Sequence, residues 1–301
     1  LFDVLHDVLR PTSAAEVTIE ANPLDVSEAA IEAFRRCGIN RVSLGVQSLN
    51  ALTLSTLDRD HREDDVRRVM HLLLDSGFIV SVDLIIAAPK QTLDAASRDI
   101  EAITALGAQH VSVYCLTWEQ GTAFWGKRAR GTLMPVAEDI EHEMFELAID
   151  RLSSSGYQQY EVSNFAQPEM MCRHNEAYWD CRPWEAFGPG AARFDGQNRI
   201  TNIRSTSAWI KNLIAGKGVT GDVDAMTPEG AARERLVLGL RRRRGVDRIS
   251  FFQQSGFQVD DLAKKPIQEW VAAGFADDDG EHVRLTRSGM LLSDSLWSAV
   301  L

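Results

Sequence analysis

The stretch Cys-Arg-His-Asn-Glu-Ala-Tyr-Trp-Asp-Cys, from Cys172 to Cys181, places two thiols and an imidazole close together. Thiolates and imidazoles bind zinc in proteins, and a neutral imidazole is also the usual axial ligand of heme iron. Common zinc sites do not use the wide spacing of these two cysteines. The residues alone leave open a metal site, a heme ligand, or a turn in which His174 and Asn175 form local hydrogen bonds while Trp179 fills core. They favour the turn.

A second candidate site is formed by three polar residues, Glu20, Gln47 and Asp83, each at or near the end of an apolar segment. Ligands of parallel sheets bind beyond the carboxyl ends of the strands, so these side chains would converge on one mouth. A single polar residue at such a position is usually a turn former or a cap. Three of them on successive strands predict a shared polar site.

The elements that must position these residues alternate between strand and helix over the first two thirds of the chain. This alternation predicts parallel βαβ units, and the most apolar strand is expected to be covered on both faces. After residue 205 the segments look helical, with a short strand before a final helix. We therefore predict two domains, 1–205 and 206–301. The expected strands are 15–23, 41–48, 79–89 and 110–118, and the expected helices of this part are 27–38, 62–77, 92–107 and 136–156.

The composition limits the classes of function. The chain has 301 residues and a formal net charge of −11, which argues against nucleic-acid partners because these need a basic face. The basic run Arg241–Arg244 follows a helical stretch and is interpreted as cations at a helix C-terminus. No apolar run reaches the roughly 18 residues that a membrane span needs, so any membrane contact is expected to be peripheral. Four cysteines without a C-x-x-C pair or a secretory signal indicate a cytoplasmic location.

Seven short motifs carry a family resemblance. They are EANP, SLGVQSLN, LDRDH, DLIIAAPKQT, YCLTWEQGTAF, YEVSNFA and CRHNEAYW, in this order along the chain. Their succession resembles the HemN/HemW branch of the radical S-adenosylmethionine (SAM) proteins over essentially the whole chain. That branch contains oxygen-independent coproporphyrinogen III dehydrogenases and HemW-type heme chaperones. The resemblance implies an α/β fold, a partial (β/α)6 barrel followed by a small C-terminal helical domain similar to a winged helix.

The resemblance also implies that Glu20, Gln47, Arg59 and Asp83 contact SAM. Arg59 would pair with the methionyl carboxylate, and the other three would meet the amine and the ribose hydroxyls. From the residues alone, Arg59 reads as a solvated charge at a helix end. The chain departs from the family at Ile86-Ala87, where Tyr-Gly is common, and at Ala192, where many relatives carry histidine.

In the family, a C-x-x-x-C-x-x-C loop after the first strand binds a [4Fe–4S] cluster. This sequence contains no such motif, and Leu1 corresponds to a helix further along the barrel. We therefore expect a barrel without its first two strands, in which a [4Fe–4S] cluster is present only if the missing N-terminal segment is. Whether the chain is an enzyme is left open.

The segment His174-Asn175-Glu176-Ala177-Tyr178-Trp179 matches the His-Asn-x-x-Tyr-Trp signature of the HemW branch. The resemblance implies heme binding with His174 as iron ligand and with Asn175, Tyr178 and Trp179 at the macrocycle. Arg173, Arg182 and Arg193 would meet the propionates. The expected function is a heme chaperone that passes heme to an unidentified acceptor protein, and a homodimer is a candidate assembly. The alternatives are a coproporphyrinogen III dehydrogenase, which acts by oxidative decarboxylation, and a degenerate remnant with a structural role.

Overall fold

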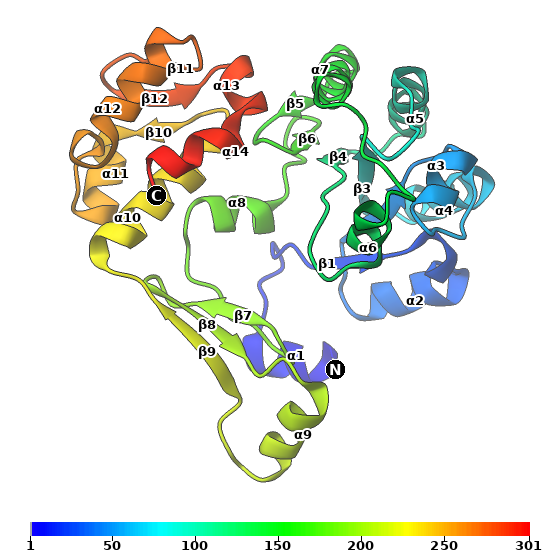
Figure 1. Cartoon of the computed structure of the whole chain (residues 1–301). Helices are drawn as coiled ribbons and strands as arrows, with labels where there is room; N and C mark the ends of the chain where they lie inside the picture. The colour runs from blue at the N-terminus through cyan, green and yellow to red at the C-terminus, as the bar shows by residue number, and fades with distance from the viewer. Residues whose placement is uncertain (1) are drawn as a thin grey trace. The chain divides into compact units, whose positions relative to one another are not determined.

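The computed structural model describes residues 2–301, and the chain forms two compact units, Leu1–Cys172 and Arg173–Leu301 (Figure 1). The boundary predicted after residue 205 falls between β8 (Asn198–Asn202) and β9 (Thr220–Ala225), which pair antiparallel in one sheet. Whether 1–205 and 206–301 fold as separate domains stays a prediction.

The first unit is built on a six-stranded sheet in the order β1-β2-β3-β4-β6-β5. The first four strands are parallel, which confirms the predicted βαβ units, whereas β6 runs antiparallel to β4 and to β5. The fold is mixed α/β, and the finer prediction of a partial (β/α)6 barrel without its first two strands stays a prediction. The strands are β1 Thr18–Ala21, β2 Arg41–Gln47, β3 Ile79–Ile86, β4 His110–Cys115, β5 Gln158–Gln159 and β6 Asn164–Ala166.

Helices connect the parallel strands, and three of them end in the same way. Gly38, Gly77 and Gly107 follow α2, α4 and α5 with φ between 68° and 84°, a left-handed conformation that glycine adopts at little cost. At the start of α2, which was expected at 27–38, the Ser27 hydroxyl caps the helix by accepting a hydrogen bond from Ala30 N. The helices of this unit are α1 Phe2–Leu9, η1 Pro23–Asp25, α2 Glu28–Arg36, α3 Ala51–Thr56, α4 Glu63–Asp75, α5 Leu93–Ala105, α6 Ala123–Ala129 and α7 Glu138–Ser154.

The sheet buries one set of alternating residues more completely than the other. Val80, Val82 and Leu84 of β3 are at most 1% exposed, and the alternate positions Asp83 and Ile85 are only partly buried. The expectation of two fully covered faces is therefore met on one face only. The alternate face carries polar residues, and these form the candidate site described below.

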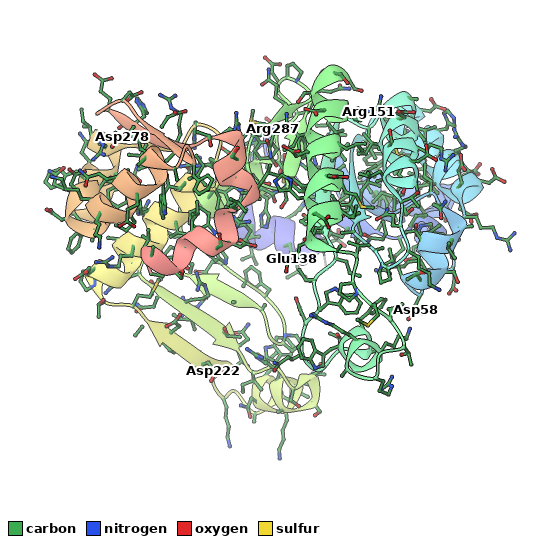
Figure 2. The ribbon with its side chains drawn as sticks, turned by 45° about the horizontal axis from the view of Figure 1, so that its top comes forward. Asp58, Glu138, Arg151, Asp222, Asp278 and Arg287 are labelled. Atoms are coloured by element: carbon green, nitrogen blue, oxygen red, sulfur yellow. The ribbon has the colours of Figure 1, made fainter. Side chains whose placement is uncertain are left out.

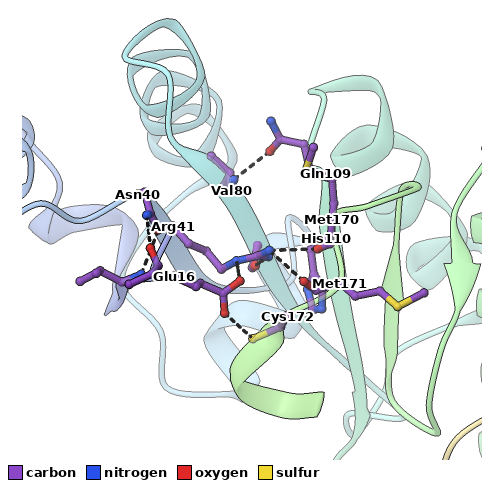
Figure 3. Close-up of polar contacts among 12 residues, drawn as sticks. Glu16, Asn40, Arg41, Val80, Gln109, His110, Met170, Met171 and Cys172 are labelled. Carbon is purple, nitrogen blue, oxygen red and sulfur yellow. Dashed lines mark hydrogen bonds and ion pairs between the residues drawn. The ribbon is translucent and has the colours of Figure 1, made fainter. Parts of the chain in front are cut away.

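A buried arginine lies near the start of β2. Arg41 is 2% exposed and donates to Glu16 Oε2 (3.1 Å), Ser81 Oγ (3.1 Å) and the carbonyl oxygens of Met170 (3.0 Å) and Met171 (3.2 Å) (Figure 3). The other carboxylate oxygen of Glu16 accepts a hydrogen bond from the Cys172 thiol. One guanidinium therefore joins the start of the sheet to the last residues of the unit.

A buried histidine near this arginine makes the stability of the chain depend on pH. Burial, together with the charge of Arg41, lowers the pKa of His110 from 6.5 to about 3, and its Nε2 lies 2.9 Å from the Tyr160 hydroxyl. The unfolded chain therefore binds a proton below pH 6.5 that the folded chain does not bind until about pH 3, so this residue makes stability fall as the pH drops. We expect a loss of about 2 kcal/mol between pH 7 and pH 5 from His110 alone.

Urea unfolding at the two pH values measures this loss. His110→Gln has no titrating ring, so the difference between pH 7 and pH 5 should shrink by about 2 kcal/mol in this variant. An equal pH dependence in both proteins would contradict the assignment.

The second unit contains two small sheets and a set of short helices. One sheet has the order β7-β8-β9 and the other β10-β12-β11, and all pairings are antiparallel. Arg248 pairs with Asp260 (2.6 Å) and with Asp278 (2.6 Å, labelled in Figure 2), which joins the start of α11 to α12 and β11. The predicted short strand before a final helix corresponds to β12 and α13, and similarity to a winged helix stays a prediction. The elements are α8 Arg173–Trp179, β7 Ala192–Phe194, β8 Asn198–Asn202, α9 Thr206–Ile214, β9 Thr220–Ala225, α10 Pro228–Leu240, β10 Val246–Asp247, α11 Arg248–Ser255, α12 Val259–Ala272, β11 Ala276–Asp278, β12 His282–Leu285, α13 Arg287–Leu291, α14 Ser293–Leu296 and η2 Trp297–Ala299.

Among the described residues, no helix combines the length and the apolar content that crossing a bilayer requires.

Candidate functional site

A pocket of about 530 Å³ lies at the ends of β1, β2 and β3 in the first unit. Its lining includes Glu20, Gln47, Arg59 and Asp83, so the structure brings together all four residues that the sequence analysis grouped in one site. Asn22, Asp25 and Ser43 also line it, and sequence reasoning did not single them out. The volume lies in the usual range of small-molecule pockets.

Asp83 lies between serines of the two neighbouring strands. The Ser43 hydroxyl donates to Asp83 Oδ2 (3.3 Å), and Ser112 lies opposite Asp83 in the register of β3 and β4. Burial raises the pKa of Asp83 and the charge of Glu20 raises it further, while the hydrogen bonds from Ser112 and Ser43 lower it in part. A cation or a hydrogen-bond donor from a ligand would therefore stabilise this carboxylate.

Gln47 and Arg59 line the pocket from the end of β2 and from the segment that follows α3. Gln47 has a φ of 65°, which turns the chain at the strand end. A Cβ atom at Gly45 would lie 3.1 Å from Gln47 Nε2, so the glycine leaves space for this side chain. Arg59 is exposed. Its neighbour Asp58, labelled in Figure 2, forms an ion pair with Lys127 of α6 (Nζ–Oδ2 3.0 Å), which ties the Arg59 segment to α6.

The second candidate site is α8 (Arg173–Trp179), whose side chains contact different neighbours. His174 and Tyr178 lie one helical turn apart, with ring centroids 4.6 Å apart and planes at 88°. Tyr178 then contacts Trp184 (4.5 Å), and Trp184 contacts Phe194 of β7 (5.0 Å). The imidazole of His174 therefore stands at the end of a row of aromatic rings, which we call the aromatic row (His174, Tyr178, Trp184 and Phe194). Asn175 is partly buried in the same helix.

Trp179 has different surroundings from Tyr178. The Arg241 guanidinium lies over the Trp179 ring at 5.0 Å from its centroid, as expected for a cation–π contact. Tyr178 lies in the aromatic row and Trp179 beside Arg241, and the expectation that both meet one ligand stays a prediction. Of the arginines expected near a ligand, Arg182 is paired with Asp180 (2.7 Å) and Arg193 lies in β7.

The four cysteines are free thiols, and Cys172 and Cys181 are both buried. Among residues 2–301, no three His, Cys, Asp or Glu side chains are grouped as metal ligands.

Two family models match this chain, one in each of its two units. Residues 3–103 match the family model of the Radical SAM superfamily, and residues 226–292 match the HemN C-terminal domain. The heme chaperone HemW of Bacillus subtilis is 33% identical over 304 residues, which cover 100% of this chain and 80% of that protein. The chain belongs to the HemW family of radical SAM proteins. The mouse mitochondrial radical S-adenosyl methionine domain-containing protein 1 is also 33% identical, over 99% of this chain and 70% of that protein.

A solved structure agrees with the mixed α/β fold of this HemW-family chain. The coproporphyrinogen III oxidase HemN of Escherichia coli superposes with a TM-score of 0.82 over 99% of this chain and 73% of that chain, at 20% identity. At this identity the likeness shows the fold alone. The radical SAM family implies SAM and a [4Fe–4S] cluster, but the cysteines of the described residues do not fit a cluster because they are not grouped.

Proposed function

We propose that this chain is a heme chaperone that binds heme and passes it to an acceptor protein, on a scaffold that also binds SAM. The aromatic row is the main support for the proposal, because it places an exposed imidazole beside flat apolar rings. A macrocycle with a central iron needs these two features, a nitrogen ligand for the metal and ring faces to cover. The names of the HemW relatives support the same function.

The pocket at the strand ends fits SAM by its donor set. SAM presents a carboxylate, an amine, a sulfonium and ribose hydroxyls. Arg59 is the cation for the carboxylate, while Glu20 and Asp83 are acceptors for the positively charged and hydroxyl groups. Gln47 can both donate and accept. Bound SAM would supply the sulfonium chemistry of the family, and these residues would hold and orient it.

A heme titration tests the chaperone function. We expect the wild-type chain to bind heme with a Soret band typical of imidazole ligation, and His174→Ala to bind it at least about tenfold more weakly, because iron ligation is lost. His71→Ala is the matched control, since His71 is an exposed helical histidine of the first unit. An unchanged Soret band and affinity in His174→Ala would remove the axial-ligand assignment, and no heme binding by the wild type would remove the function.

For the SAM pocket, we expect Asp83→Asn to gain stability and lose ligand affinity. The raised pKa means that folding disfavours the ionised carboxylate, so at pH 7 the ionised Asp83 costs stability that the amide does not. The variant should melt about 2–4 °C higher at pH 7, as expected for about 1 kcal/mol. As the pH falls, wild-type Asp83 takes up its proton, so the difference in melting temperature between the variant and the wild type should narrow.

Isothermal titration with SAM provides the second measurement for Asp83→Asn, and binding should weaken because the amide carries no charge for a cationic ligand. Asp75→Asn changes an exposed carboxylate at the end of α4 and should leave affinity for SAM unchanged. Unchanged SAM affinity in Asp83→Asn would exclude Asp83 from the ligand site.

A further inference from the structure

A second pocket, of about 400 Å³, lies within the second unit. It is bounded by the end of α8, the C-terminal half of α10 and the β10–α11 segment. Two glycines allow the backbone to close around it. A Cβ atom at Gly239 would lie 2.5 Å from Val246 Cγ2, and one at Gly245, where φ is 68°, would lie 2.2 Å from the carbonyl oxygen of Val283. Close backbone packing therefore fixes the walls of this pocket.

Three arginines line the pocket and meet around Asp180. Arg242 and Arg244 both contact its carboxylate, and the Arg244 Nη2–Asp180 Oδ1 distance is 2.8 Å. Arg235 differs from them because its acceptors are neutral, the carbonyl oxygen of Asp180 (3.1 Å) and Gln254 Oε1 (2.8 Å). Arg235 therefore brings a positive charge to the pocket that its hydrogen-bond partners do not neutralise.

The pocket carries a net positive charge. Its ionisable lining consists of three arginines, the two carboxylates Asp180 and Asp247, and His282, which lies 3.4 Å from Asp247. Outside the lining, Arg182 pairs with Asp180 and Glu176 pairs with Arg244. Asp279 lies 3.9 Å from His282 and itself pairs with Arg284, so the four residues outside the lining add two charges of each sign. One uncompensated positive charge matches a singly charged anion such as a carboxylate better than a doubly charged phosphate.

The Trp179 indole adds a hydrogen-bond donor and an aromatic face. Trp179 lines the pocket, and its buried Nε1 has no hydrogen-bond acceptor among residues 2–301. A buried donor without an acceptor is unfavourable, and a ligand oxygen would satisfy it. Arg241 covers one face of the ring, and the remaining aromatic surface suits the apolar body of a ligand that carries the anionic group.

We propose that this pocket is a carboxylate-binding site in which Arg235 is the principal contact and Trp179 covers the apolar part of the ligand. The carboxylate can be a side chain of a tetrapyrrole or a free organic acid. The first source rests on the proposed heme-chaperone function. Trp179 lies five residues after His174 in the same helix, about 7.5 Å along its axis and about 140° around it. Binding measurements with heme and with benzoate decide between the two sources.

Arg235→Gln tests the site, with Arg243→Gln as the matched control because Arg243 is an exposed arginine of the same unit that does not line the pocket. Melting temperatures first establish that both variants are folded. The ligands are heme, heme dimethyl ester, in which both carboxylates are masked, and benzoate as a free aromatic carboxylate. Heme binding is followed in the Soret region and benzoate binding by calorimetry.

We expect Arg235→Gln to bind benzoate and heme about tenfold or more weakly with the Soret position unchanged, as expected for loss of a charge-assisted hydrogen bond. Heme dimethyl ester should bind the wild type as weakly as heme binds Arg235→Gln, and Arg243→Gln should resemble the wild type. If Arg235→Gln weakened benzoate binding but left heme binding unchanged, the pocket would be assigned to free organic acids.

The outcomes separate this site from the proposed function. Wild-type heme binding together with unchanged affinities of Arg235→Gln for heme and benzoate would overturn the carboxylate site and leave the chaperone function standing. Arg235-dependent benzoate binding without any heme binding would support the site and overturn the chaperone function.

Discussion

Arg41→Met should destabilise the first unit by about 3–5 kcal/mol, the usual cost of removing one partner of a buried ion pair. The arginine is 2% exposed and the Glu16 side chain 11%. Without the guanidinium, Glu16 Oε2 and the carbonyl oxygens of Met170 and Met171 lose the hydrogen bonds that Arg41 donates, in surroundings that water reaches poorly. This cost is a large part of the 5–15 kcal/mol by which proteins of this kind are usually stable.

Urea or guanidinium unfolding at pH 7 measures the effect, with Arg35→Met as the control. Arg35 is an arginine of α2 in the same unit, but its side chain is 49% exposed and pairs with Glu32 on the surface, so we expect a loss of at most about 1 kcal/mol. Arg41→Lys should fall between the two, since a lysine keeps the charge but cannot reach four acceptors in one plane. Equal losses in Arg41→Met and Arg35→Met would show that the buried network contributes little.

The sequence was sufficient to predict the elements whose pattern is local. Helix caps such as Ser27, closing glycines such as Gly77 and the apolar run of β3 fix their own segments, and each lies where it was expected. The pocket at the strand ends was predictable for a related reason. Parallel strands bring their carboxyl ends to one edge, so Glu20 and Asp83 meet without any information about distant contacts.

Other features depend on contacts between distant parts of the sequence and could not be predicted in the same way. Strands β7, β8 and β9 are short and polar, so they carry little periodic signal, and their pairing was not foreseen. The run Arg241–Arg244 does follow the end of α10, as predicted, but Arg242 and Arg244 also contact Asp180, about sixty residues earlier. Arg235 was not singled out at all, because its role depends on a pocket that exists only in the folded chain.

Gly289→Ala should destabilise the second unit, although alanine is the better helix former. Gly289 lies in α13, where alanine would ordinarily gain about 1 kcal/mol. Here a Cβ atom would lie 1.9 Å from the carbonyl oxygen of Phe275 and 2.8 Å from its carbonyl carbon. That carbonyl cannot move freely, because it accepts a hydrogen bond from Thr286 N (3.0 Å). We expect a net loss of about 3 kcal/mol, at the upper end of overpacking costs.

Gly218→Ala is the matched control for this position. A Cβ atom at Gly218 would meet no heavy atom within 4 Å, so alanine there should be neutral or should stabilise by up to about 1 kcal/mol through the unfolded chain. Thermal and urea unfolding therefore measure the same glycine-to-alanine change at two positions. We expect a loss of stability at Gly289 and no loss at Gly218. A neutral Gly289→Ala would mean that α13 does not pack against the Phe275 backbone. A loss confined to Gly289→Ala would show that contact with this carbonyl, and not helix propensity, determines the residue at position 289.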